Sequence, residues 1–429
     1  MRNFDVRMRG NADDGYRVEV TASPAGETPE ATRMPSPLEH ATVESALRDL
    51  RDFRADPNTV RGLGNALWHA VFRSPIAGRY AESLGMAGDE GLRVRLRIDP
   101  AELQLLPWEY LHNPATEQFL ALSRRTSLVR YVARPQPVPP LQVDGPLRVL
   151  VLISAPADQP ALHVGQERTL IEDALNPLTD AGAVELTVET DGRPARLQDL
   201  LRERFHVLHY IGHGMLTLGQ GYLVLEDDEH ASRFVGAAAL ETLLGGTSLR
   251  CVVLTACESA AAPGDPFLGL APALVRGGVP AVVAMQMPMP DESAVVFTRE
   301  FYRSLARRWP IDACVTEGRL GIRTAVREMR IDWGIPTLFT RSDDGVIFAG
   351  GKLRSAKHDQ EAVGEKPPVM IRSGGLDFPP GSKITFKGDV AGRDVIRANL
   401  DRPAKADEST DVITSVWRAI RRLFSERSP

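Results

Sequence analysis

The sequence is poor in cysteine, and the few cysteines are not spaced as pairs. Only three occur among 429 residues, Cys251, Cys257 and Cys314, and no two of them stand as C-x-x-C. A small odd number argues against a disulfide framework and for a reducing compartment. The missing C-x-x-C pair also argues against a zinc site built from cysteines.

The sequence also lacks long apolar runs and any large excess of one charge. No run of about 18 apolar residues occurs, and residues 1–18 lack the apolar core of a secretory signal. The net charge is −5 and the pI is near 6.0, so there is no basic footprint for nucleic acid. We therefore predict a cytoplasmic protein with no transmembrane segment and no nucleic-acid partner.

What is present is a chain long enough for two or three domains, with one clear internal boundary. The 429 residues exceed one ordinary core, and the segment 134–146 is rich in proline. Beyond residue 351 the apolar pattern decays into polar linkers around a β-rich patch and an amphipathic helix. We predict an N-terminal accessory lobe (1–140), a main domain (141–351) and a tail (352–429).

Apolar strands alternate with helices after the proline-rich boundary. The predicted strands are Leu147–Ser154, Val184–Glu189, His206–Ile211, Leu249–Thr255 and Val279–Met285. The predicted helices are Glu167–Leu178, Leu197–Arg204, Ala237–Leu244 and Phe267–Arg276, with two more from Asp291 and from Asp312. Continuous apolar strands between helices predict a mostly parallel sheet covered on both faces, a three-layer α/β/α sandwich.

The accessory lobe and the tail carry weaker patterns. In the lobe, helices are predicted at Leu38–Phe53 and Leu63–Phe72, and a strand at Arg93–Ile98. In the tail, a short β-rich patch covers Lys383–Ile396, and a helix covers Asp411–Phe424. The fold class is therefore α/β, with a smaller α/β lobe before the main domain and a short β/helix tail after it.

Two chemically able residues follow the ends of predicted strands. His213 stands between Gly212 and Gly214, which allow a sharp turn and lead us to expect the imidazole at the surface of a cleft. Cys257 follows the end of the predicted strand Leu249–Thr255, and one crossover helix separates that strand from His206–Ile211. The carboxyl ends of neighbouring parallel strands meet at one edge of a sheet. A thiol needs a nearby base to supply thiolate at neutral pH. We therefore predict a catalytic pair, His213 and Cys257, with the backbone N–H groups of Gly214 and Cys257 as an oxyanion hole.

Plainer interpretations apply to neighbouring residues. Cys251 and Cys314 are expected to be buried small hydrophobes. His209 lies inside a strand and is expected to be packed and hydrogen-bonded. A dinucleotide-binding loop at Gly212 fails because Thr217 stands where the third glycine of the fingerprint belongs.

These residues lie in motifs that resemble a known family. The motifs are Tyr210-Ile-Gly-His-Gly214, Leu254-Thr-Ala-Cys-Glu-Ser259, Leu106-Pro-Trp-Glu-Tyr-Leu111, Phe119-Leu-Ala-Leu-Ser123, Gly277-Gly-Val-Pro-Ala-Val-Val283 and Trp333-Gly-Ile-Pro-Thr-Leu-Phe339. Their order is similar to that of the CHAT domain, a caspase-like and separase-like cysteine peptidase family of the caspase–gingipain clan. The resemblance covers roughly residues 90–350. It implies a caspase-like fold, a His/Cys dyad, a protein substrate and no metal or organic cofactor, with the accessory lobe a degenerate copy of the fold.

Two acidic residues are candidates for a substrate pocket. Caspases carry Q-A-C-[RQG]-G, whereas this chain has Thr255-Ala-Cys-Glu-Ser259, so a preference for aspartate is not carried over. Asp291 follows a strand end and fits either the floor of a pocket for a basic P1 residue or the N-cap of a helix from Glu292. Glu258 is ambiguous in the same way.

The resemblance predicts a regulated bacterial cysteine endopeptidase that an activating partner switches on. The alternative is an inactive caspase-like scaffold that acts by binding proteins. Residues 366–429 contain a Gly-Asp-Val-Ala-Gly-Arg-Asp run that resembles segments of bacterial signalling proteins. We expect self-association through them, against the alternatives that they dock on the body of the protein or touch a membrane surface.

Overall fold

The computed structural model describes residues 1–350, except for 134–137, 218–219, 256–265 and 326–330. The described residues belong to one compact unit, Met1–Leu353. The predicted patch and helix of the tail, the predicted self-association segment 366–429, Cys257 and Glu258 all lie outside the described residues.

The centre of the described fold is an 11-stranded sheet with the order β10-β9-β11-β15-β16-β17-β7-β4-β1-β2-β3. Neighbouring strands are parallel except at β16–β17, β1–β2 and β2–β3. The bounds are β1 Arg2–Asn11, β2 Gly15–Ala22, β3 Thr32–Met34, β4 Leu92–Ile98, β7 Thr126–Tyr131, β9 Leu147–Ser154, β10 Val184–Glu189, β11 Val207–Gly212, β15 Cys251–Thr255, β16 Ala281–Met285 and β17 Pro336–Thr340. The predicted mostly parallel sheet is confirmed.

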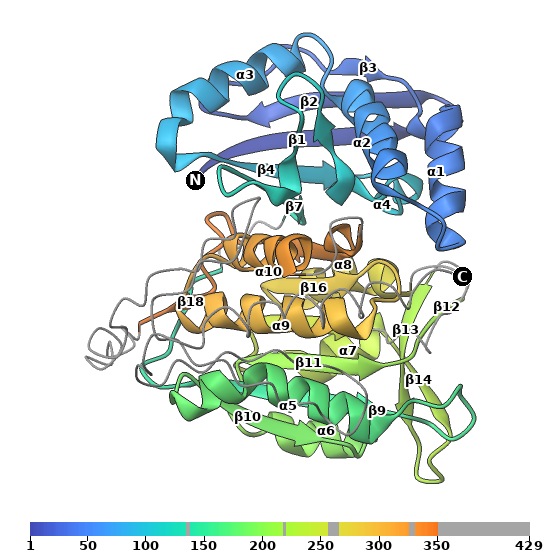
Figure 1. Cartoon of the computed structure of the whole chain (residues 1–429), viewed down its shortest axis with the longest axis vertical. Coiled ribbons are helices and arrows are strands. Elements are labelled where there is room, and N and C mark those ends of the chain that lie inside the picture. Colours follow the sequence, from blue (N-terminus) through green and yellow to red (C-terminus); the bar gives the residue numbers. More distant parts are fainter. Residues whose placement is uncertain (134–137, 218–219, 256–265, 326–330, 351–429) are drawn as a thin grey trace, which may run out of the picture. The chain divides into compact units, whose positions relative to one another are not determined.

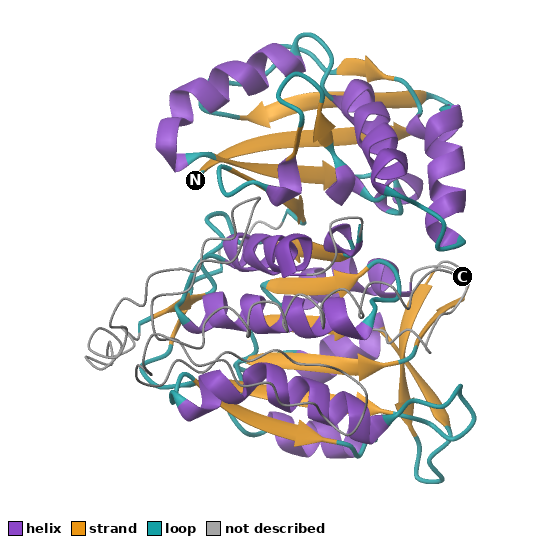
Figure 2. Cartoon of the chain, in the orientation of Figure 1, coloured by secondary structure: helices purple, strands orange, loops and turns teal. Residues whose placement is uncertain are grey.

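Helices cover both faces of this sheet (Figures 1 and 2). The helices are α1 Ala41–Arg51, α2 Pro57–Val71, α3 Ile76–Ala87, α4 Ala101–Gln104, α5 Val164–Asp180, α6 Pro194–Leu201, α7 Ala237–Leu244, α8 Pro266–Gly277, α9 Asp291–Ala306 and α10 Ile311–Ala325. Short 3-10 turns are η1 Pro37–Glu39, η2 Gly88–Glu90, η3 Trp108–Tyr110, η4 Leu120–Leu122 and η6 Asp332–Gly334.

The alternation of side chains along the strands builds two hydrophobic cores. In β9, Val149 and Val151 pack with residues of α5, α9 and α10, whereas Leu150 and Leu152 pack with residues of α6, α7 and α8. β9 therefore buries both of its faces, which is why its sequence is almost continuously apolar. The predicted three-layer α/β/α sandwich is confirmed.

Smaller strands complete the described fold. A second sheet, β12 Gly214–Thr217, β13 Gln220–Glu226 and β14 Ser232–Gly236, is inserted between β11 and α7. Two short pairs are β5 His112–Asn113 with β6 Gln118–Phe119, and β8 Leu141–Gln142 with β18 Phe348–Ala349. The sequence analysis predicted none of these, and it also missed β1, β2, β3, β7, β17, α3 and α4.

A buried ion pair and a buried hydrogen bond join the segment 1–140 to the segment 141–351. Arg93 in β4 makes a two-pronged pair with Asp312 in α10 at 2.9 and 3.0 Å, and both side chains are almost fully buried. The guanidinium of Arg130 in β7 pairs with the buried carboxylate of Glu109 at 2.7 Å. Gln286, after β16, donates to the same carboxylate at 3.1 Å. The predicted boundary near residue 140 thus falls between strands of one sheet, and an independent accessory lobe stays a prediction.

Trp108 and Trp333 belong to two of the motifs quoted above. The indole of Trp108 donates to the carbonyl of Leu103 at 2.7 Å, and Trp333 packs edge-on against Tyr110 with ring centroids 5.1 Å apart. The contact between Trp333 and Tyr110 therefore joins the two segments, whereas the bond of Trp108 lies within the first of them.

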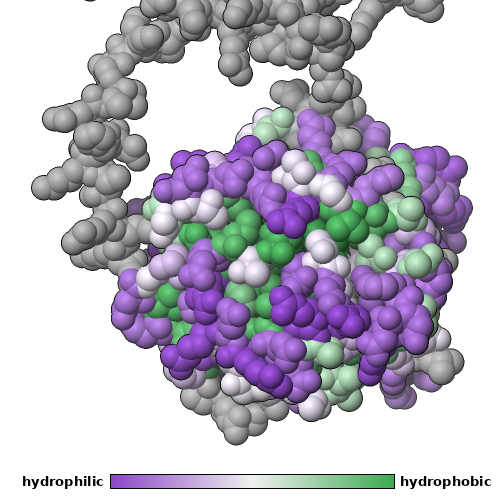
Figure 3. Space-filling model, turned by 90° about the horizontal axis from the view of Figure 1, so that it is seen from below, coloured by the Kyte–Doolittle hydropathy of each residue, from purple (hydrophilic) through white to green (hydrophobic). Residues whose placement is uncertain are grey.

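The outer face of the main domain, which carries β10 and α6, has a polar rim around an apolar strip (Figure 3). β10 is the edge strand on this side and pairs only with β9 in the described sheet. Among the described helices, none has the length and apolar character needed to cross a membrane.

Candidate active site

His213 follows directly on β11, and its ring is held by a backbone carbonyl. Its Nε2 atom lies 3.0 Å from the carbonyl oxygen of Pro160. Because a carbonyl oxygen only accepts, Nε2 carries the proton in the neutral ring, and the lone pair is on Nδ1. Nδ1 is therefore the atom that can act as a base.

The predicted surface position of this imidazole is wrong. His213 is only 4% exposed, and the chain after β9, which includes Pro160, lies against its ring. Burial lowers the pKa of His213, and the hydrogen bond to Pro160 opposes this effect in part. The ring is therefore neutral at pH 7, as a general base must be.

The segment that carries Pro160 is anchored to the second sheet. The side chain of Gln159 donates to the hydroxyl of Ser232 in β14 at 2.8 Å, and that hydroxyl donates to the carboxylate of Asp158 at 2.6 Å. The backbone N–H of Ser232 also donates to Asp158 at 2.9 Å. These bonds fix the residues next to Pro160 and so fix the direction of its carbonyl.

Tyr210 and Gly214 fix the backbone around His213. The buried hydroxyl of Tyr210 lies 2.9 Å from the carbonyl oxygen of His213 and 2.8 Å from that of Val224. A Cβ atom at Gly214 would lie 2.5 Å from Pro266 at the start of α8, so this position requires glycine. Sequence reasoning assigned Tyr210 no role, although its place in the Tyr-Ile-Gly-His-Gly motif was a usable signal.

The register of two strands sets the spacing of the predicted pair. Ile211 in β11 is paired with Thr255 in the neighbouring parallel strand β15. His213 and Cys257 each follow this pair by two residues. Cys257 and Glu258 lie outside the described residues, so the predicted dyad, the oxyanion role of Gly214 and Cys257, and the role of Glu258 stay predictions.

His209 is packed and hydrogen-bonded, as predicted. Its Nε2 atom lies 2.9 Å from the hydroxyl of Thr255, and its Nδ1 atom lies 3.2 Å from the hydroxyl of Tyr302 in α9. Burial lowers the pKa of His209 to about 3. It is therefore a neutral link between β11, β15 and α9 and not a second base.

Asp291 is the first residue of α9, and its carboxylate does not cap the helix. The N-cap position belongs to Pro290, so the N-cap interpretation of Asp291 is wrong. Its carboxylate accepts a hydrogen bond from the side chain of Gln166 at 2.9 Å. Asp291 also lines a small cavity of about 30 Å³ together with His209 and Thr255 at the strand ends. The substrate-pocket role of Asp291 stays a prediction.

The two other cysteines are buried. Cys251 and Cys314 are fully buried and free, and burial raises the pKa of both thiols. The prediction that they are small hydrophobes is confirmed. Within the described ranges, no group of three or more His, Cys, Asp or Glu side chains is placed to hold a metal ion.

Comparison with known proteins gives the following relatives. A chain of the separase–securin complex from Saccharomyces cerevisiae is 15% identical over 58% of this chain, with a TM-score of 0.35. This chain spans only 15% of the length of that one. The complex of pro- and mature domains of RgpB from Porphyromonas gingivalis is 11% identical over 73% of this chain and 78% of that one, with a TM-score of 0.38.

A match to a family model identifies the family of this chain. No curated protein matches the chain. The family model described as the CHAT domain matches residues 61–343, which is well over half of the chain and includes His213, Cys257 and the motifs around them. This chain therefore belongs to the CHAT domain family.

Proposed function

We propose that this chain is a cysteine endopeptidase in which Cys257 is the nucleophile and His213 is its base. The observation that supports the proposal is the equal offset of the two residues from the paired couple Ile211 and Thr255. Neighbouring strands lie about 4.8 Å apart. Two residues of chain span no more than about 7 Å, so the proposal places Cys257 near the end of β15.

The arrangement around His213 suits acyl transfer. Nδ1 takes the proton of the Cys257 thiol, and the sulfur attacks the carbonyl carbon of a peptide bond. The backbone N–H groups of Gly214 and Cys257 stabilise the oxyanion, and His213 then gives its proton to the leaving amine. Water then adds to the acyl-enzyme and gives a proton to His213. The product acid leaves, and His213 returns the proton to the sulfur, which restores the thiol. The Pro160 carbonyl keeps the ring oriented through these steps.

Regulation by a partner is supported by the burial of His213. At 4% exposure the ring has little contact with solvent, so access of a protein substrate to it is restricted. A partner that moves the segment around Pro160 would open the site. We include in the proposal a bacterial setting, which rests on the family resemblance, and a cytoplasmic one, which rests on the sparse cysteines. We also include self-association through residues 366–429. Deleting 366–429 and measuring mass in solution tests the last part, and an unchanged mass would refute it.

A preference for a basic P1 residue is the specificity that Asp291 supports. Its carboxylate lies at the strand ends, where an arginine or lysine of a substrate that displaces Gln166 would pair with it. An Asp291→Asn variant is expected to lower cleavage after basic residues by roughly tenfold or more, because a charge-assisted pair is lost. Equal cleavage of basic and neutral P1 peptides by the wild type would reject this pocket.

The test of the peptidase is a peptide-library cleavage profile of three proteins. These are the wild type, Cys257→Ala and the control Cys314→Ala, which removes a thiol that is buried and far from β15 in sequence. We expect cleavage by the wild type and by the control, and none by Cys257→Ala with its circular dichroism unchanged. If the Cys257→Ala protein retains the biological effect of the wild type, the chain is an inactive scaffold instead.

A further inference from the structure

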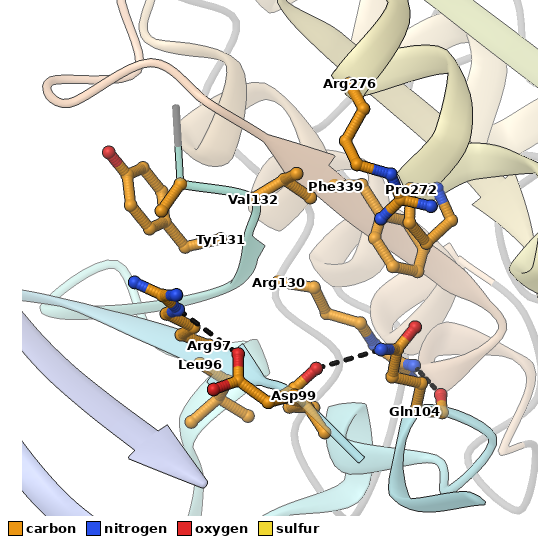
Figure 4. A pocket seen from close by; sticks show the side chains of 12 residues that line it. Leu96, Arg97, Asp99, Gln104, Arg130, Tyr131, Val132, Pro272, Arg276 and Phe339 are labelled. Carbon is orange, nitrogen blue, oxygen red and sulfur yellow. Dashed lines mark hydrogen bonds and ion pairs between the residues drawn. The ribbon is translucent and has the colours of Figure 1, made fainter. Parts of the chain in front are cut away.

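A second cavity lies at the edge of the sheet opposite His213. It has a volume of about 240 Å³ and is lined by the last residues of β4 and β7 and the residues just after them, by Phe339 in β17 and by Pro272 and Arg276 in α8 (Figure 4). β17 is antiparallel to β16, so the carboxyl ends of β17 and β7 lie away from those of β11 and β15. The cavity is therefore separate from the candidate active site.

Positive charge dominates the lining of this cavity. Its charged side chains are Arg97, Arg130, Arg276 and Asp99. Asp99 already accepts hydrogen bonds from Arg97 at 3.2 Å and from Arg7 at 2.8 Å. The charge of Arg130 is balanced by Glu109.

Arg276 is the remaining charged side chain that lines the cavity. It makes no hydrogen bond or ion pair with any residue that the structure describes. It is exposed in the last turn of α8, and its side chain reaches toward Phe339 and Pro272, across the cavity from Arg97 and Asp99 (Figure 4). A guanidinium in this position is a ready partner for an anion.

The part of the cavity wall between these charged side chains is apolar and closely packed. Phe339 and Pro272 are buried, and the guanidinium of Arg130 lies over the ring of Phe339, 5.4 Å from its centroid. The side chain of Gln104 is tied to the carbonyl of Ile98 at 2.9 Å. A ligand that fits has a charged head for Arg276 and a compact apolar body for the wall.

We propose that this cavity is a binding site for a small organic anion, with a carboxylate or phosphate head on a flat apolar body. The planar guanidinium fork matches both head groups. Drug-sized ligands occupy pockets from about 300 Å³ upward, so this cavity suits a smaller molecule. Such a ligand would contact both α8 and the strands of the accessory segment.

Calorimetric titration tests the site without using peptidase activity. Phenyl phosphate and benzoate are the probes, inorganic phosphate supplies the head group alone, and benzyl alcohol supplies the ring alone. The titrations are carried out in the Cys257→Ala background, so that failure of the proposed catalysis does not affect them. We expect saturable binding of phenyl phosphate or benzoate, weaker binding of inorganic phosphate and none of benzyl alcohol.

Variants locate the binding. Arg276→Gln is expected to lower the affinity for the probe roughly tenfold, because one charge-assisted hydrogen bond is lost. Arg307→Gln is the matched control, because Arg307 is also an exposed arginine at the carboxyl end of a helix, α9. Ala133→Trp places a large ring on the exposed rim and is expected to weaken binding without loss of charge. Absence of saturable binding of both probes, or equal losses in Arg276→Gln and Arg307→Gln, would overturn the proposal.

Discussion

The imidazole of His213 and the carbonyl of Pro160 are joined by a hydrogen bond of 3.0 Å across 53 residues of sequence. This bond decides which ring nitrogen can be the base, because the proton stays on the nitrogen that faces the carbonyl. A backbone carbonyl cannot be deleted by a side-chain substitution. Its orientation is therefore best tested through the side chains that hold its segment in place.

Ser232→Ala removes the hydroxyl that bridges Asp158 and Gln159. We expect kcat to fall several-fold with little change in KM, because the ring of His213 loses its fixed direction while substrate contacts remain. Steady-state kinetics on the best peptide substrate give both constants. Thr217→Ala, which removes an exposed hydroxyl at the end of β12, is the control. An effect on KM alone would assign Ser232 to substrate binding instead.

The pH dependence of kcat/KM follows from the buried state of His213. Burial lowers its pKa below the ordinary value of 6.5, so the ring stays neutral and basic at more acidic pH than a free histidine. The acid limb of the kcat/KM profile is therefore expected below pH 6.5. A limb at or above this value would show that the free enzyme exposes the ring.

The stability of the fold is expected to depend on pH through His209. Its pKa is about 3 when folded and 6.5 when unfolded, so the unfolded chain binds more protons at pH values between the two. No stability is lost above 6.5, and each pH unit below it removes about 1.4 kcal/mol of unfolding free energy through this residue. Urea denaturation of wild type and His209→Gln measures the difference. Parallel curves from pH 7 to pH 4 would contradict the assignment.

The buried pair of Arg130 and Glu109 lies within the segment 1–140 and holds the carboxylate to which Gln286 of the other segment donates. Glu109→Ala leaves a buried guanidinium without its carboxylate, and we expect a loss of about 3–5 kcal/mol of unfolding free energy. Glu44→Ala, which breaks an exposed pair with Arg48, is expected to cost at most about 0.5 kcal/mol. Chemical denaturation of both variants checks the contrast. Equal losses of unfolding free energy in the two variants would mean that water reaches the guanidinium of Arg130 once the carboxylate of Glu109 is removed.

Much of the main domain was predictable because its strands bury both faces. The bounds of β9, β10 and α7 are those that the sequence analysis gave. β1 was overlooked, although Phe4, Val6 and Met8 alternate with exposed or polar neighbours as a strand requires. The inserted sheet β12–β14 was missed because the segment between β11 and α7 was considered only as a crossover.

The candidate site was only partly predictable, because local patterns carry no information about distant contacts. The glycines beside His213 indicated a turn, but nothing near them shows that Pro160 covers the ring. The N-cap prediction for Asp291 failed because Pro290 occupies that position and the carboxylate bonds to Gln166 instead. The partners that these two side chains do have, Pro160 for His213 and Gln166 for Asp291, lie 53 and 125 positions away in the sequence.

The most direct test of the dyad is the rate at which iodoacetamide alkylates each cysteine, measured by mass spectrometry in wild type and His213→Ala. We predict rapid labelling of Cys257 at pH 7, at least about tenfold slower labelling in the variant, and no labelling of Cys251 or Cys314 in the folded protein. The same rate at Cys257 in both proteins, rising as an ordinary thiol titrates near pH 8.5, would contradict the account.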